Sequence, residues 1–141
     1  MSEQIKHECG IAMIRLRKPL SFYQDKYGTA LYGLNKLKLL MQKMRNRGQD
    51  GAGMATLKLN VEPGHKYISR KRSNASNYLD DLFSQVFRRF GELTPEQLAD
   101  GDWLKANLPY TGELLMGHLR YGTNGNKSKD KCHHNLHLNK R

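Results

Sequence analysis

One amphipathic helix, expected between residues 31 and 44, constrains the fold more than any other feature of this sequence. Its apolar side chains recur at steps of three and four residues and so share one face: Leu31, Leu34, Leu37, Met41 and Met44. A face of this kind has to be covered by another layer of the protein. The short apolar runs before and after the helix are the candidates for that layer.

Three segments have the composition of β-strands. Residues 9–16, "CGIAMIRL", form a short apolar run, which predicts a strand buried on both faces. Residues 53–60, "GMATLKLN", alternate in polarity, which predicts a half-buried strand. Residues 112–122, "GELLMGHLRYG", are the third candidate.

Two further helices are expected in the second half of the chain. Residues 76–90 carry apolar side chains at helical spacing, and "TPEQ" at 94–97 has the capping-box pattern that starts a short helix. Residues 17–28 interrupt the first strand with a proline and polar residues, and residues 62–66 indicate a turn. The predicted order is strand, helix, strand, helix, helix, strand, an α+β arrangement in one or two layers.

The charge of the chain is large and unevenly distributed. The formal net charge is +11, and residues 1–60 hold 11 basic and 4 acidic residues, residues 61–116 hold 7 and 8, and residues 117–141 hold 6 and 1. Because the excess is split between the two ends, without interleaved aromatic residues, we expect no nucleic-acid partner. No apolar stretch is long enough to cross a membrane, and "MSEQIKHE" lacks the apolar centre of a signal peptide. We therefore expect no membrane partner and a cytoplasmic location.

Two cysteines are too few for a disulfide framework. Cys9 has two interpretations: a small buried side chain at the start of a strand, or a thiol nucleophile. Cys132 lies in a tail with three histidines that could offer metal ligands: His133, His134 and His137. This tail lacks a paired C-x-x-C element, so we predict no metal site.

The segment "RNRGQDGAG" at residues 45–53 is glycine-rich and basic. It is not a P-loop, because no Gly-Lys-Ser/Thr sequence follows and the segment opens a strand. A tight connection with positive φ would explain Gly48 and Gly51. It would not explain the identities of the polar residues Arg47, Gln49 and Asp50.

The segment "GHLRYGT" at residues 117–123 puts Arg120 at the end of an apolar strand. A partly buried guanidinium at such a position needs an anion. Either an internal carboxylate or the carboxylate of a substrate, bound in bidentate geometry, would supply it.

Taken in order, these three segments resemble the class II glutamine amidotransferase domain, which belongs to the N-terminal nucleophile hydrolases. The resemblance rests on Cys-Gly-Ile from Cys9, Arg-Gly-Gln-Asp-x-Ala-Gly from Arg47, and Gly-His-x-Arg-Tyr-x-Thr from residue 117. At positions 49 and 121 the sequence has Gln and Tyr, as is typical of the glutamine phosphoribosylpyrophosphate amidotransferases of purine synthesis, which it resembles more than the other members of the class. The hexosamine-forming relatives usually carry Tyr and Trp at those positions.

The resemblance implies a fold and a division of the chain. The fold would be part of a four-layer α-β-β-α sandwich of two antiparallel sheets. Residues 1–8 would be a leader or propeptide, residues 9–123 the N-terminal part of the amidotransferase domain, and residues 124–141 an irregular basic tail. Residues 60–112 match no motif of the family.

The resemblance also assigns roles to side chains. Cys9 would attack the side-chain amide of glutamine, releasing ammonia and leaving a cysteinyl thioester that water hydrolyses to glutamate. Arg47 would help to hold the nucleophile end of the site, and Arg120 would bind the glutamine α-carboxylate. His118 would be a packed structural residue. The loop at the carboxylate would be shaped by Tyr121, Gly122 and Thr123.

The chemistry of the family requires Cys9 to become the first residue of the chain. The base is the α-amino group of that cysteine, whose ordinary pKa of about 7.7–8.0 suits it to accept the thiol proton. An amide nitrogen cannot do so, because its lone pair is delocalised. We therefore expect cleavage between Glu8 and Cys9.

Two parts of the family pattern have no counterpart in this sequence: the Asn-Gly oxyanion-hole pair with its following aspartate, and the phosphoribosyltransferase domain. We expect an N-terminal fragment whose own enzyme activity is left open, with a non-catalytic remnant or binding module as the alternative. Magnesium would belong to the phosphoribosyltransferase domain, so no cofactor is expected in this chain. Glutamine is the expected small-molecule partner, and the full-length family allows a homo-oligomer.

Overall fold

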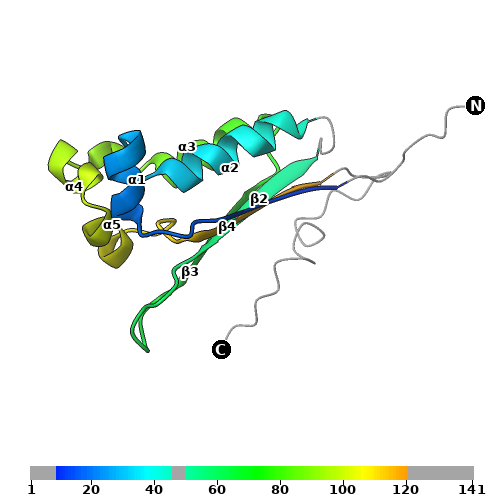
Figure 1. Ribbon diagram of the computed structural model, residues 1–141. Helices are drawn as coiled ribbons and strands as arrows, with labels where there is room; N and C mark the ends of the chain where they lie inside the picture. Colours follow the sequence, from blue (N-terminus) through cyan, green and yellow to red (C-terminus); the bar gives the residue numbers. More distant parts are fainter. Residues whose placement is uncertain (1–8, 46–49, 121–141) are drawn as a thin grey trace, which may run out of the picture.

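The computed structural model of the chain describes residues 9–45 and 50–120 (Figure 1). Its strands form one antiparallel sheet in the order β1-β4-β2-β3, so β4 and β2 are central and β1 and β3 are the edges. The strands are β1 (Gly10–Arg15), β2 (Gly51–Leu57), β3 (Ile68–Ser73) and β4 (Leu114–Arg120). The mixed α+β composition agrees with the sequence prediction.

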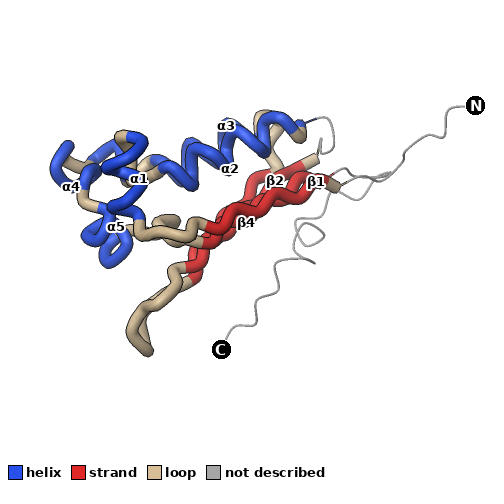
Figure 2. Tube along the Cα trace, viewed as in Figure 1, coloured by secondary structure: helices blue, strands red, loops and turns tan. Residues whose placement is uncertain are grey.

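The helices lie on one face of the sheet and at one end of it (Figures 1 and 2). α2 packs on β1 and β4, and α3 packs on β2 and β3, whereas α1 and α4 both contact α5. The helices are α1 (Leu20–Tyr27), α2 (Tyr32–Lys43), α3 (Tyr78–Phe87), α4 (Pro95–Ala99) and α5 (Gly101–Asn107), with a short 3-10 turn at Phe90–Glu92. In the described ranges, no helix combines the length and the apolar character that crossing a membrane requires.

The amphipathic helix predicted at residues 31–44 is confirmed as α2. Leu34, Leu37 and Met41 are buried in the core. α2 approaches β4 closely at Gly117, where an added Cβ would stand 2.5 Å from the Met41 sulfur and 3.2 Å from a Leu37 methyl. Gly117 thus has a packing role, because the absence of a side chain allows α2 to approach the sheet closely.

The burial of two strands differs from the sequence prediction. β1 is buried on one face only, because Ile11 and Met13 are each 62% exposed while Ala12 between them is buried. The prediction of two buried faces was wrong here. β2 differs in the opposite sense: six of its seven residues are buried, because the strand lies between β3 and β4.

Gly51 has a different explanation from the one expected, whereas Gly48 lies outside the described residues. Gly51 has no positive φ; it is the first residue of β2 and pairs with Arg120. Gly53 lies opposite His118 on one side and Arg72 on the other. Because directly opposite residues share a face, small side chains on β2 leave room for the long side chains of its neighbours.

Three elements were missed by the sequence prediction: α1, β3 and α5. Pro19 precedes α1 as its N-cap residue, and Gly28 ends that helix with a φ of 79°. The short helix at residues 95–99 was predicted correctly, with both capping-box hydrogen bonds present between Thr94 and Gln97. Element length explains the two missed helices, since α1 and α5 have only 8 and 7 residues, too few to show a clear helical period.

Gly112 gives the sharpest test of this packing. A Cβ added there would meet the Leu57 carbonyl oxygen at 2.1 Å and the Lys58 nitrogen at 2.9 Å, and these backbone atoms cannot rotate away. We expect Gly112→Ala to lower the free energy of unfolding by about 2 kcal/mol or more, measured by urea denaturation.

Gly91→Ala is the matched control, because an added Cβ there has no neighbour within 4 Å. Its free energy of unfolding should stay within about 0.5 kcal/mol of the parent chain. Equal stability of the two variants would show that residue 112 does not sit against β2.

Candidate functional site

The three motifs meet at one end of the sheet. β1 begins at Gly10 directly after Cys9, β2 begins at Gly51 directly after Asp50, and β4 ends at Arg120. The register pairs Gly10 with Leu119 and Gly51 with Arg120. Paired Cα atoms in antiparallel strands are about 4.5–5.5 Å apart. Segments separated by more than a hundred residues in sequence are therefore neighbours here.

Cys9 and Arg120 each lie one residue beyond the same strand pair, Gly10 and Leu119. The Cys9 thiol is free and exposed. An exposed thiol at a strand end is accessible to a small molecule, whereas a buried cysteine, the other interpretation of Cys9, would be inert.

Arg120 is half-buried at the end of the central strand β4. Its carbonyl oxygen accepts a hydrogen bond from the Asp50 N–H at 3.0 Å, which fixes the start of β2 against the end of β4. Within residues 9–45 and 50–120, no carboxylate forms an ion pair with its guanidinium. The internal salt bridge considered above is thus not formed in this part of the chain, and the charge stays available to an anion.

His118 lies two residues before Arg120 and so on the same face of β4. Its side chain is 8% exposed, and its Nε2 has no hydrogen-bond partner among the described residues. Burial lowers the pKa of the imidazole, and the positive charge of Arg120 lowers that pKa further. His118 is therefore neutral near pH 7, as suits the packed residue that the sequence predicted.

A second group of side chains borders this end of the sheet and was not found from the sequence. A cavity of about 240 Å³ lies where α2 ends and α3 begins, lined in part by Arg45 and Tyr78. Burial raises the pKa of the Tyr78 phenol, while Arg45 lowers it and Asp50 raises it, so all three groups are within electrostatic reach. No sequence signal joins these residues, because only the packing of α3 beside α2 brings them together.

The remaining predicted site residues lie outside the described ranges: Arg47, Tyr121, Gly122 and Thr123. The same holds for Gln49 and for the histidines of the tail. Among the residues that the structure describes, no cluster of three or more His, Cys, Asp or Glu side chains could hold a metal ion.

Comparisons of the chain with protein-family models, with curated proteins and with solved structures found no match. The resemblance to the class II glutamine amidotransferases therefore rests on the three sequence motifs.

The burial of His118 predicts that the chain loses stability in acid. Its imidazole titrates near the ordinary pKa of 6.5 in the unfolded chain and below that value in the folded chain. Below about pH 6.5 the unfolded state therefore binds a proton that the folded state does not, and the free energy of unfolding falls by up to about 1.4 kcal/mol per pH unit. Urea denaturation between about pH 5 and pH 8 measures this slope.

His118→Gln should flatten that pH dependence. His65→Gln is the matched control, because His65 is exposed in the turn before β3 and should leave the slope unchanged. An unaltered slope in His118→Gln would place the responsible proton on another group.

Proposed function

We propose that this chain carries the glutamine site of a class II glutamine amidotransferase and, once Cys9 is the first residue, performs the glutaminase half-reaction. We propose that it performs this half-reaction as the amidophosphoribosyltransferases of purine synthesis do. Support comes from one observation above all: the strand register that makes Cys9 and Arg120 neighbours at one end of the sheet. The three motifs are far apart in the sequence, and their proximity at one end of the sheet supports a common site.

The side chains have complementary chemistry for this reaction. Arg120 is a half-buried guanidinium without a carboxylate partner in the described ranges, and a guanidinium binds a carboxylate in bidentate geometry. Cys9 supplies a thiol that is open to solvent. A glutamine whose α-carboxylate binds Arg120 would have its side chain in the neighbourhood of this thiol.

The reaction follows from these groups. The α-amine of Cys9 takes the thiol proton, and the thiolate sulfur attacks the amide carbon of the glutamine side chain. The C–N bond breaks, the proton passes to the leaving nitrogen, and ammonia departs from the resulting thioester. Water then cleaves the C–S bond, giving glutamate and the free thiol. No cofactor is required for this half-reaction.

We also propose that the sheet belongs to a four-layer sandwich. The two helices that pack on the sheet, α2 and α3, cover one face, while the other face exposes Ile11 and Met13 among the described residues (Figure 1). Apolar side chains on a sheet face are normally covered by a second layer about 10 Å away. A second sheet on this face would complete the expected α-β-β-α order.

A non-catalytic glutamine-binding module is the second candidate. One observation favours it: in the sequence Cys9 is joined to Glu8, so its nitrogen is an amide and cannot act as the base. The two candidates differ in whether this bond is cleaved.

Cleavage is tested by the intact mass of the purified chain. We expect the mass to correspond to a protein that begins at Cys9, and we expect Cys9→Ala to retain residues 1–8 if the thiol itself attacks the preceding carbonyl. A chain that keeps residues 1–8 and releases no ammonia from glutamine would favour the binding module.

Glutaminase activity is tested with a chain that begins at Cys9. Replacing that cysteine by alanine should abolish ammonia release while glutamine still binds, as measured by calorimetry. Arg120→Ala should raise KM roughly ten- to hundredfold, because hydrogen bonds to a charged group contribute about 1.5–3 kcal/mol.

Arg15→Ala is the matched control for Arg120→Ala. Arg15 is exposed and is the last residue of β1, at the end of the strand opposite to Cys9. Its replacement should therefore leave KM unchanged. An equal effect of the two arginine substitutions would remove Arg120 from the glutamine site.

A further inference from the structure

A second candidate site, here called the basic pocket, lies at the opposite end of the sheet from Cys9. It is a cavity of about 430 Å³ between the β2–β3 connection and the end of α5. Its polar lining is almost entirely made of groups that donate hydrogen bonds or carry positive charge: Lys58, His65, Lys66, Arg89, Lys105 and Asn107. No carboxylate is among its lining residues.

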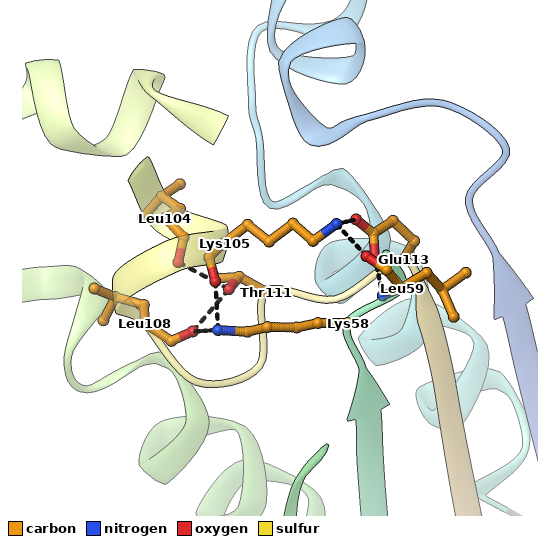
Figure 3. A network of polar contacts seen from close by, with 7 residues as sticks. All are labelled: Lys58, Leu59, Leu104, Lys105, Leu108, Thr111 and Glu113. Carbon is orange, nitrogen blue, oxygen red and sulfur yellow. Dashed lines mark hydrogen bonds and ion pairs between the residues drawn. The ribbon is translucent and has the colours of Figure 1, made fainter. Parts of the chain in front are cut away.

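Two of these lysines are held in place by backbone carbonyl groups (Figure 3). The Lys58 ammonium donates to the carbonyl oxygens of Lys105 and, at 2.8 Å, of Leu108. The Lys105 ammonium donates to the carbonyl oxygen of Leu59 and pairs with the Glu113 carboxylate. An ammonium has three N–H donors, so each lysine retains one for a further acceptor.

The other two cations are on the rim of the pocket and are unpaired. Lys66 and Arg89 are exposed, and neither side chain forms a hydrogen bond or an ion pair with any residue in the described ranges. Both side chains are therefore free to move onto a ligand.

The positive charge of the basic pocket is poorly compensated. Glu113 is the carboxylate that pairs with a pocket lysine in the described part of the chain, against four cationic side chains. Burial lowers the pKa of Lys58, the charges of Lys105 and Lys66 lower it further, and Glu113 opposes them. The lysines thus repel one another at a partly dehydrated site, and an anion would relieve that repulsion.

We propose that the basic pocket binds the phosphate group of a small phosphorylated molecule. A phosphate dianion offers several acceptor oxygens to lysine and arginine donors. Because the pocket has an excess of more than one positive charge, a dianion also matches its charge better than a single carboxylate does. The cavity volume falls in the range of about 300–1,000 Å³ usual for small-molecule sites. The proposal is independent of the glutamine site, because the pocket uses none of its residues.

Inorganic phosphate is the probe for the first experiment, with thermal unfolding and calorimetry as readouts at about pH 7.5 and constant ionic strength. We expect saturable binding and a rise in Tm that chloride does not reproduce. The double variant Lys66→Gln with Arg89→Gln should weaken phosphate binding at least tenfold. Both substitutions are on exposed side chains, so folding should be retained.

Lys43→Gln with Arg88→Gln is the matched control pair. Both residues are exposed, neither lines the basic pocket, and Arg88 adjoins Arg89 in the sequence. This pair should bind phosphate as the parent chain does. Equal weakening in the two double variants, or an effect that never saturates, would overturn the proposal because it would indicate general screening of charge.

A single-stranded oligonucleotide of about 20 nucleotides separates the proposal from binding of nucleic acid. We expect it to compete poorly with phosphate. Tight binding of the oligonucleotide, with a steep salt dependence and the same loss in both double variants, would contradict a small-molecule phosphate site.

Discussion

The pairing of β4 with β1 on one side and β2 on the other is the constraint on which the rest of this structure depends. It aligns Gly10 with Leu119 and Gly51 with Arg120, and thereby brings the two halves of the chain into one sheet. β4 also receives α2, since Gly117 leaves the space that Leu37 and Met41 fill. One strand thus carries the core contact of the main helix on one face, and His118 and Arg120, at the proposed glutamine site, on the other.

The far end of the same strand is fixed by a polar junction. The Glu113 carbonyl accepts a hydrogen bond from the Leu16 N–H at 2.7 Å, while its carboxylate accepts one from the Leu59 N–H at 2.8 Å and pairs with Lys105. The connection after β2 and the segment from α5 to β4, which lie mostly within residues 60–112, are held together here (Figure 3). The molecule therefore has two chemically different ends: a thiol with an arginine, and a lysine-lined pocket.

Sequence reasoning was effective where a period or a cap was strong. The helix at residues 31–44 and the capping box at Thr94 follow from local chemistry, and both were predicted correctly. Sequence reasoning failed where burial depends on strand order. Nothing in "GMATLKLN" indicates that β2 is a central strand, and nothing in "CGIAMIRL" indicates that β1 is an edge strand. The basic pocket was not predicted, because Lys58 and Lys105 meet only through the packing of α5. At the Cys9 end, the motifs indicated the residues, but only the register shows that two of them are neighbours.

The most direct test of this account is mass spectrometry of the acid-quenched reaction of glutamine with the chain that begins at Cys9. We predict a glutamyl adduct, with ammonia lost, on the peptide that contains Cys9. The adduct should be strongly reduced in Arg120→Ala. Turnover of glutamine with no adduct on Cys9, or an adduct that forms equally well without the Arg120 guanidinium, would contradict a shared site at this end of the sheet.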